Sequence, residues 1–202
     1  MIRIGITGGI GSGKSTVCRI LEEHGAAVYD SDANAKRLMN EDAELRRQLT
    51  AEFGEKCFNE RGLDRAYLAS IVFSDAERLQ RLNEIVHPAV RADFRKWCGE
   101  HEERDYVILE SAILFDAGFD SETDKTLAVV APQSLRIERV CKRDGMSRED
   151  VEKRIAQQMS DDELQARADY TIANISLDYL RSDAEQLDKI FRYEAHCRAI
   201  RS

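Results

Sequence analysis

The sequence has no excess of basic residues. Its 30 Lys and Arg face 38 Asp and Glu, which gives a formal net charge of −8. A general nucleic-acid binder needs a basic face that displaces counterions, so this balance argues against that class. Long apolar runs and a signal-peptide pattern are also missing: runs such as 127–131 are far shorter than the roughly 20 residues that cross a bilayer. We therefore expect a cytoplasmic protein that binds neither nucleic acid nor membrane.

Paired cysteines are missing as well. The cysteines are odd in number, widely spaced and without a C-x-x-C pair: Cys18, Cys57, Cys98, Cys141 and Cys197. Neither a zinc site nor a disulfide framework has this spacing. We expect reduced thiols, most of them buried on helices as small apolar side chains.

Short β-branched and apolar runs alternate with helical patterns, and prolines are rare. The runs at 2–7, 26–29, 106–110, 126–131 and 170–173 predict five strands. Helical patterns at 14–24, 133–143, 147–159 and 177–200 fall after these runs, and the third opens with Ser147-x-x-Asp150, which resembles a capping box with Asp in place of Glu. This alternation predicts an α/β fold of three layers, with a five-stranded, mostly parallel sheet covered on both faces.

A block with helical patterns only interrupts the alternation. Its predicted helices are 32–39, 42–53, 64–73, 76–86 and 88–101, with linkers at 54–62 and 74–75. Pro88 is expected to begin the last of these helices, because the first turn does not use the missing N–H. We interpret the block as an insertion.

The segment Gly8-Gly9-Ile10-Gly11-Ser12-Gly13-Lys14-Ser15 matches the phosphate-loop motif G-x-x-x-x-G-K-[ST] in full. Glycines allow consecutive N–H groups to face one anion, and the following helix adds positive charge at its N-terminus. Lys14 is then the candidate for the β- and γ-phosphates, Ser15 for Mg²⁺ and Thr16 for the α-phosphate. The alternative is a glycine-rich turn that binds nothing. The motif predicts a nucleoside triphosphate site.

The residues after the second strand favour a kinase. No Asn is followed by Lys, so the N-K-x-D motif that reads guanine is absent. Asp30-Ser31-Asp32 follows the strand at 26–29, and the carboxyl ends of parallel strands meet at the ligand crevice. A carboxylate there can accept the proton of an acceptor hydroxyl or bind Mg²⁺. The alternative is that these residues only cap the next helix.

Further segments resemble the dephospho-coenzyme A kinase family in family order. They are the phosphate loop, Val28-Tyr29-Asp30-Ser31-Asp32, Leu82-Asn83-Glu84-Ile85-Val86-His87-Pro88, Arg143-Asp144-Gly145-Met146-Ser147, Arg154-Ile155-Ala156-Gln157-Gln158-Met159 and Ala168-Asp169-Tyr170-Thr171-Ile172-Ala173-Asn174. The resemblance implies a P-loop kinase that uses ATP and Mg²⁺ to phosphorylate the ribose 3′-hydroxyl of dephospho-coenzyme A. It also implies three regions: a nucleotide core (1–32, 105–142 and 166–202), an acceptor-binding helical insertion (33–104) and a helical lid (143–165).

The resemblance also assigns candidate residues. Asp32 is the candidate base and Arg143 the lid arginine on the phosphates, while Thr7, His87, Leu114 and Phe115 join Asp32 as candidates for contact with the acceptor. ATP contacts are expected from Gly9, Ile10, Gly11, Ser12, Gly13, Lys14, Ser15, Thr16 and Arg143, with Ser15 also on the metal. Ala112 stands where the family commonly has proline. This departure affects the backbone path of residues 111–116, and with it the acceptor contacts expected from Leu114 and Phe115.

Several alternatives stay open at this stage. Arg143 is equally explained as a charge at a helix end, with Arg139 and Arg148 as competitors for the phosphates. His87 also fits a half-buried residue before a helix, and the apolar pair Leu114 and Phe115 fits the core. Asp30, Asp32 or Glu110 could organise Mg²⁺. A kinase for a nucleoside monophosphate or another small alcohol, or a non-catalytic ATP-dependent regulator, competes with the named function, and a monomer or weak homo-oligomer is expected.

Overall fold

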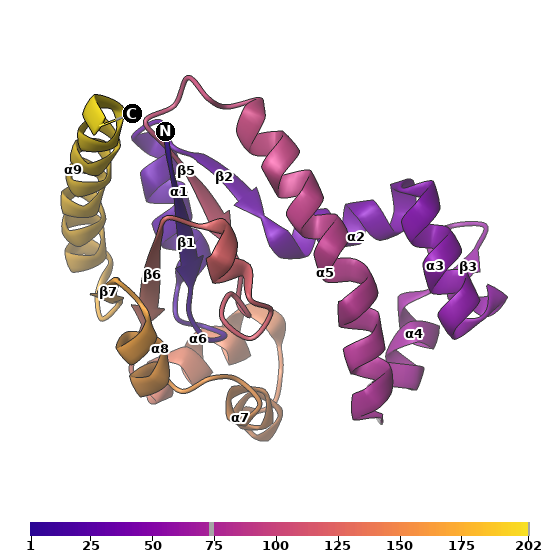
Figure 1. Cartoon of the computed structure of the whole chain (residues 1–202). Helices are drawn as coiled ribbons and strands as arrows, with labels where there is room; N and C mark the ends of the chain where they lie inside the picture. The colour runs from indigo at the N-terminus through magenta and orange to yellow at the C-terminus, as the bar shows by residue number, and fades with distance from the viewer. Residues whose placement is uncertain (73–74, 202) are drawn as a thin grey trace. The chain divides into compact units, whose positions relative to one another are not determined.

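The computed structural model describes residues 1–72 and 75–201, and it divides into two compact units, residues 30–97 and the remainder. The larger unit holds a five-stranded sheet in the order β2-β5-β1-β6-β7 (Figure 1). Its strands are β1 (Ile2–Thr7), β2 (Ala27–Asp30), β5 (Tyr106–Glu110), β6 (Lys125–Val130) and β7 (Tyr170–Ala173). The predicted strands and the α/β class are confirmed.

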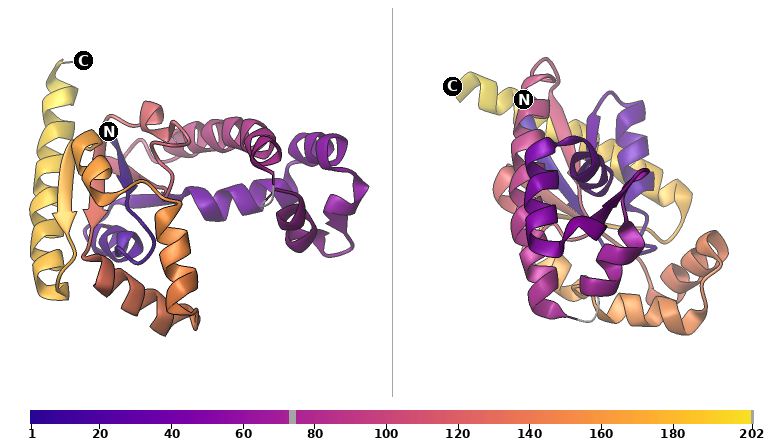
Figure 2. Two further views of the ribbon diagram at one scale, coloured as in Figure 1. Left: turned by 90° about the horizontal axis from the view of Figure 1, so that it is seen from below. Right: turned by 90° about the vertical axis from the view of Figure 1, so that its right-hand side faces the viewer.

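The central strand β1 pairs in parallel with β5 on one side and with β6 on the other. Alternate side chains point to opposite faces, so Ile2, Ile4 and Ile6 share one face. Helices α1 (Lys14–Glu23) and α9 (Leu177–Arg201) cover that face, and the left view in Figure 2 shows α9 lying along the sheet. Full burial of each such side chain contributes about 1.5–3 kcal/mol.

The other face of β1 is covered by the chain between β5 and β6. Gly5 lies so close to this segment that a Cβ atom on it would be 2.8 Å from a Leu114 methyl group. The segment includes a 3₁₀ turn, η2 (Phe119–Glu122), and Asp124 at its end bonds the backbone and side chain of Arg3. The sheet is therefore covered on both faces, as expected.

Three helices follow β6 in the chain: α6 (Gln133–Asp144), α7 (Arg148–Ala156) and α8 (Asp161–Arg167). The predicted cap of α7 is confirmed, because the Ser147 hydroxyl accepts a hydrogen bond from the Asp150 N–H. Helix α8 was not predicted. Ser160 and Glu163 form a capping box at its start, a signal that the sequence carried.

The smaller unit contains α2 (Ser31–Glu41), α3 (Ala43–Phe53), α4 (Arg65–Val72) and most of α5 (Ala76–Gly99). The predicted linker at 54–62 contains a 3₁₀ turn, η1 (Glu55–Cys57), and leads into a hairpin of β3 (Phe58–Asn59) and β4 (Gly62–Leu63). The unit has its own buried side chains, among them Leu38, Leu45, Leu49, Phe53, Leu68 and Phe94. Phe73 and the linker residue Ser74 lie outside the described residues.

The prediction of two helices divided at Pro88 is wrong, because α5 runs through this residue. Proline inside a helix removes one backbone hydrogen bond and costs about 3 kcal/mol. Val86, Val90 and Phe94, spaced four residues apart, are all buried on one face of α5. Burial along this single face outweighs the local preference for a break.

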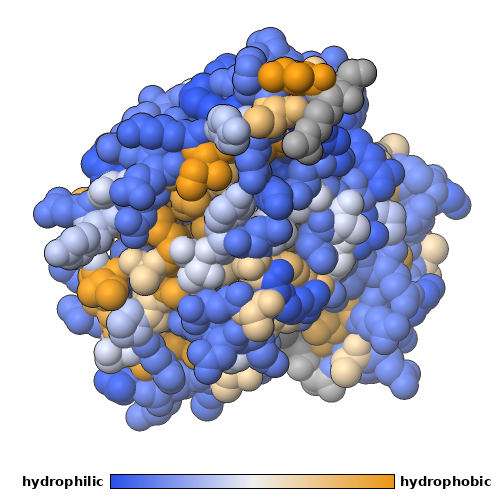
Figure 3. Space-filling view, turned by 60° about the vertical axis from the view of Figure 1, so that its left-hand side comes forward, coloured by the Kyte–Doolittle hydropathy of each residue, from blue (hydrophilic) through white to orange (hydrophobic). Residues whose placement is uncertain are grey.

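The surface is largely hydrophilic with scattered apolar patches on the face shown in Figure 3. Cys18, Cys57 and Cys98 are buried, which confirms that most of the cysteines lie inside the fold, and all five are free thiols. Among the described residues, none of the helices has both the length and the apolar character needed to span a membrane.

Candidate active site

The phosphate loop leaves the centre of the sheet and ends at the first residue of α1. Gly11 and Gly13 have φ values of +77° and +100°, a backbone region that favours glycine. A Cβ atom on Gly13 would also lie 2.0 Å from Nδ2 of Asn174, which donates to the Ser12 carbonyl at 2.8 Å. Glycine is therefore required at position 13 by conformation and by contact.

Lys14 and Ser15, the last two residues of the motif, are held by neighbouring groups. Nζ of Lys14 donates to the Gly8 carbonyl at 2.7 Å. Burial lowers the pKa of the Lys14 ammonium, and the Glu110 carboxylate opposes that shift. The Ser15 hydroxyl donates to Oε1 of Glu110 at 2.7 Å. The loop thus presents one ammonium and a hydroxyl–carboxylate pair.

A cavity of about 180 Å³ opens beside the loop. It is lined by Gly11, Gly13, Lys14, Ser15, Thr16, Arg139, Val140 and Arg143. Most of these are residues that the sequence proposed for ATP. Gly9, Ile10 and Ser12 belong to the loop but do not line this cavity; Ser12 is fully buried.

Two of the three competing arginines line the cavity. Arg139 donates to the carbonyl and side-chain oxygens of Asn174, at 3.3 and 3.1 Å. Arg143 forms two hydrogen bonds with Asp144, at 2.7 and 2.8 Å, and its side chain is 65% exposed. Arg148 pairs with Glu152 and is not among the lining residues. Arg143 has the freedom to turn toward a phosphate, whereas Arg139 is fixed.

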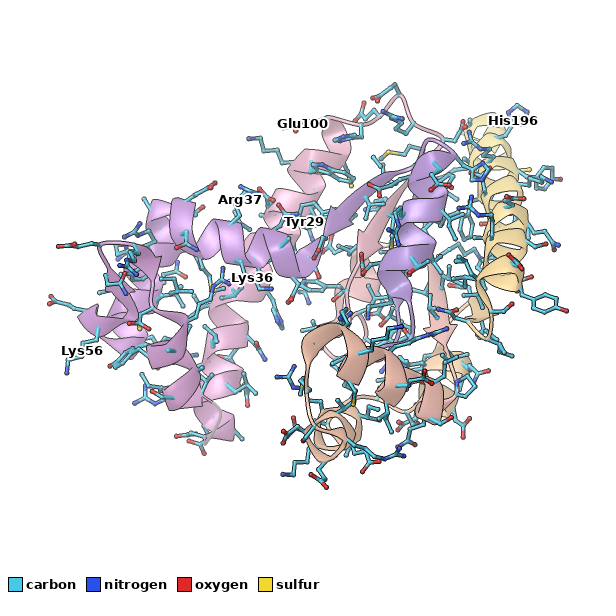
Figure 4. The ribbon with its side chains drawn as sticks, turned by 180° about the vertical axis from the view of Figure 1, so that it is seen from behind. Tyr29, Lys36, Arg37, Lys56, Glu100 and His196 are labelled. Carbon is cyan, nitrogen blue, oxygen red and sulfur yellow. The ribbon has the colours of Figure 1, made fainter. Side chains whose placement is uncertain are left out.

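In the smaller unit, the two acids after β2 have different roles. Asp30 is the N-cap of α2 and accepts hydrogen bonds from the N–H groups of Asp32 and Ala33. Asp32 pairs with Lys36 at 3.0 Å, and its side chain is 87% exposed. Lys36 and its neighbour Arg37 project from the same helix (Figure 4). The capping alternative therefore applies to Asp30 and leaves the Asp32 carboxylate accessible.

The remaining acceptor candidates differ in exposure. His87 lies half-buried on α5, and burial followed by the charge of Arg91 lowers the pKa of its imidazole. Thr7 is fully buried at the end of β1, and its hydroxyl has no hydrogen-bond partner within the described ranges. Phe115 lines a different cavity, of about 210 Å³, under the Arg167 guanidinium.

Leu114 requires a correction. The sequence offered it as an acceptor contact or a core residue, and its exposed fraction is 0%. Its methyl groups fill the space above Gly5. Because no part of the side chain reaches the surface, Leu114 is a core residue.

Sequence reasoning missed three side chains that bond the loop. Asn174 bonds Ser12, while Arg136 and Gln158 bond Ile10. Asn174 follows β7, and a polar residue at the carboxyl end of a strand is a signal that could have identified it. Arg136 belongs to none of the segments singled out in the sequence. Gln158 lies in the segment 154–159, whose residue pattern gives no sign of a contact with the loop.

A sequence model of the dephospho-CoA kinase family matches residues 2–178. Among curated relatives, the dephospho-CoA kinase of Salinibacter ruber is 46% identical over 177 residues, which cover 86% of this chain and 89% of the relative. That of Chlorobaculum tepidum is 40% identical over 193 residues, covering 91% and 92%.

Solved structures share the fold of this chain. A Thermus thermophilus protein has a TM-score of 0.76 at 39% identity, covering 92% of this chain and 95% of its own. The dephospho-CoA kinase of Campylobacter jejuni has a TM-score of 0.70 at 23% identity, covering 95% and 98%. Shikimate kinase from Acinetobacter baumannii shares the fold at 16% identity, with a TM-score of 0.54 over 96% and 94% of the two chains.

Proposed function

The chain belongs to the dephospho-CoA kinase family, and from this membership we propose how its residues carry out the reaction. It is a kinase of coenzyme A biosynthesis that transfers the γ-phosphoryl group of ATP to the ribose 3′-hydroxyl of dephospho-coenzyme A, giving coenzyme A and ADP. The cavity where Lys14, Ser15 and Arg143 meet is the observation that supports a phosphoryl-transfer site most directly. A kinase for another small alcohol and a non-catalytic ATP-dependent regulator are not favoured.

ATP is assigned to the loop cavity. Lys14 compensates charge on the β- and γ-phosphates, and Arg143 exchanges Asp144 for the transferred group. The lining residues Gly11, Gly13, Ser15 and Thr16 are assigned to the chain of phosphates. Gly9, Ile10, Gly11 and Ser12 complete the loop that surrounds the phosphates. Such a site works through alignment and electrostatic stabilisation rather than through covalent chemistry.

Magnesium is assigned to the Ser15 hydroxyl, with Glu110 beside it. Mg²⁺ prefers oxygen ligands, and a hydroxyl 2.7 Å from a carboxylate supplies two of them. The described residues hold no group of three or more His, Cys, Asp or Glu side chains suited to a metal. A site of one or two protein oxygens fits the way Mg²⁺ binds with nucleotide phosphates. When bound, the ion neutralises charge on the phosphates.

Asp32 is assigned as the base that orients the 3′-hydroxyl and takes its proton. The carboxylate is not used as a cap, and it pairs with the exposed side chain of Lys36. An exposed pair of this kind contributes little, about 0–1 kcal/mol, so Asp32 is readily released from it. The transferred proton moves late, because most of the catalysis is alignment.

The acceptor is assigned to the helical insertion at 33–104, with His87 as a further contact, and residues 143–165 are assigned as the lid. Thr7 and Phe115 are not included, because Thr7 is fully buried and Phe115 lines a different cavity. Burial lowers the pKa of His87 and so favours the neutral imidazole, which can donate or accept a hydrogen bond. The five free thiols suit a reducing compartment, so the enzyme is assigned to the cytoplasm, as a monomer or weak homo-oligomer.

The assignment is tested with the purified chain, ATP, Mg²⁺ and a panel of acceptors: dephospho-coenzyme A, nucleoside monophosphates, shikimate and gluconate. Mass detection should find a phosphorylated product with dephospho-coenzyme A alone, at its ribose 3′ position. A higher kcat/KM for any other acceptor would contradict the substrate assignment. ATP binding without any transfer would favour a regulatory protein.

A further inference from the structure

Ile10 occupies a position where the phosphate-loop motif accepts any residue, yet side chains from far along the chain bind both of its backbone polar groups. Its N–H donates to Oε1 of Gln158 at 2.8 Å. Its carbonyl oxygen accepts from Nε of Arg136 at 3.0 Å. The partners lie 148 and 126 residues away. Phosphate chemistry explains the glycines and Lys14 of the motif but explains neither of these contacts.

Arg136 is itself fixed from several sides. Its side chain is only 4% exposed, and Nη1 donates to Oδ1 of Asp161 at 2.8 Å. Asp161 is the first residue of α8, so the arginine joins the phosphate loop to that helix. A buried charge is costly unless it is paired, and this pairing leaves the guanidinium little freedom to move.

Nη2, the remaining guanidinium nitrogen of Arg136, explains why position 9 of the loop is a glycine. A Cβ atom on Gly9 would lie 2.0 Å from Nη2, which has no hydrogen-bond partner in the described part of the chain. Gly9 is not among the glycines with a positive φ, in contrast to Gly11 and Gly13. The close approach of Arg136, and not the backbone conformation, requires glycine at position 9.

The side chain of Ile10 adds an apolar contact to the same region. It packs against a small buried cluster of Ile137 and Val140 from α6 and Val151 from α7. Ile10 is therefore held through its N–H, its carbonyl and its side chain, by three segments that follow β6. These contacts all lie within the larger unit.

We propose that Arg136 and Gln158 are positioning residues: by holding the Ile10 peptide they keep the phosphate loop in the conformation that receives ATP and join it to α7 and α8. The inference rests on the proposed kinase function. A loop ordered before ATP arrives loses less conformational freedom on binding, so these contacts lower the Kd for ATP. Neither residue is assigned to the acceptor, so the KM for dephospho-coenzyme A is independent of them.

The first test is Gln158→Met, which keeps the side-chain length and removes the acceptor oxygen. Gln157→Met is the matched control, since Gln157 is the exposed neighbour. Calorimetry on the full chain without acceptor should give a Kd for ATP about 3- to 10-fold higher for Gln158→Met, the loss expected for one hydrogen bond. Gln157→Met should bind like the unmodified chain. Equal Kd values for both variants would overturn the proposal.

Two further measurements separate positioning from general destabilisation. Hydrogen exchange of the Ile10 amide should accelerate in Gln158→Met and stay slow in Gln158→Glu, which retains an acceptor oxygen. In steady-state assays, Gln158→Met should raise the KM for ATP and leave the KM for dephospho-coenzyme A unchanged. An equal rise in both KM values would indicate a merely structural role.

The second test is a double-mutant cycle between Gly9→Ala and Arg136→Met. In the unmodified chain the new methyl group meets the guanidinium, so Gly9→Ala should weaken ATP binding. In the Arg136→Met background the methyl has room, and the same change should have little further effect. Additive effects would contradict the proposed contact. Arg136→Lys, which keeps a charge toward Asp161, replaces Arg136→Met if that variant does not fold.

The outcomes keep the two proposals apart. A chain that binds ATP but phosphorylates no acceptor defeats the proposed function, while the Kd for ATP still reports on Ile10. If the unmodified chain is an active kinase and its Gln158→Met variant binds ATP with an unchanged Kd, only the positioning role is wrong.

Discussion

The hydroxyl of Ser15 donates a hydrogen bond to Glu110 at 2.7 Å, and this bond joins the first turn of α1 to the carboxyl end of β5. The sequence offers three carboxylates that could organise Mg²⁺: Asp30, Asp32 and Glu110. Asp30 is used to cap α2 and Asp32 pairs with Lys36. Of the three, Glu110 is the one bonded to the hydroxyl that the phosphate-loop motif assigns to the metal.

Glu110→Gln should therefore raise the Mg²⁺ concentration needed for half-maximal activity about 10-fold, the usual effect of losing a residue that supports a metal ligand. The amide keeps the shape of the carboxylate and removes its charge. Asp30→Asn is the control, because asparagine caps a helix as well as aspartate does. Its Mg²⁺ titration should match that of the unmodified chain; a shift there and none in Glu110→Gln would move the role to Asp30.

Asp32→Asn should lower kcat about 100-fold or more, the range for loss of a general base, and leave the Kd for ATP unchanged. The side chain is exposed, so the free energy of unfolding should change little. Lys36→Met separates loss of the ion pair from loss of the base, since it removes the pair and keeps Asp32. The kcat of Lys36→Met should stay close to that of the unmodified chain. Undiminished turnover in Asp32→Asn would remove this residue from the mechanism.

Arg143→Ala should lower kcat/KM for ATP about 10-fold or more, because a hydrogen bond to a charged group contributes roughly 1.5–3 kcal/mol. Arg143 lines the loop cavity, whereas Arg148 does not. Arg148→Ala should therefore change kcat/KM little. Steady-state kinetics with ATP as the varied substrate compares the two, and the reverse order of effects would assign the phosphates to Arg148.

From the hydrogen bonds of Asp124 we predict that the free energy of unfolding decreases in acid. Burial alone raises the pKa of this carboxyl, but hydrogen bonds from Arg3 and Arg198 outweigh it and lower the pKa from 3.8 to about 2. The charged form is favoured in the folded state, so its contribution, about 2 kcal/mol, is present above pH 4 and is lost as the pH falls through 2.

Urea unfolding at several pH values checks this expectation against Asp124→Asn, which does not titrate. The unmodified chain should exceed the variant in free energy of unfolding at pH 5, and the difference should shrink toward pH 2. A difference that stays constant over this range would show that the stability does not depend on ionisation of Asp124.

The strand, loop and helix that begin the chain could be predicted because their signals are local. An apolar run, glycines with positive φ and a helix-starting Lys14 follow one another without help from the rest of the fold. The cap of α7 at Ser147 is equally local, and it was predicted for the same reason.

The failures have a common physical cause, which is contact between distant residues. Pro88 obeys a local rule that burial on α5 overrides, and Leu114 is decided by its contact with Gly5. Arg136 reaches the loop across 126 residues, and no spacing in the sequence marks that contact. For the candidate site, the motif therefore predicts the loop residues Gly11, Gly13, Lys14 and Ser15 of the cavity, and tertiary contacts decide which other side chains line it or support the loop.

The position of β1 at the centre of the sheet has a consequence for the nascent chain. The strand is synthesised before its partners β5 and β6, whose first residues are Tyr106 and Lys125. Asn174, which fixes the loop through Ser12, is made later still. Contacts so distant in sequence form slowly. Strand β1 and the loop after it are thus completed only when residues far later in the chain have been made, and the apolar strand needs protection during translation until then.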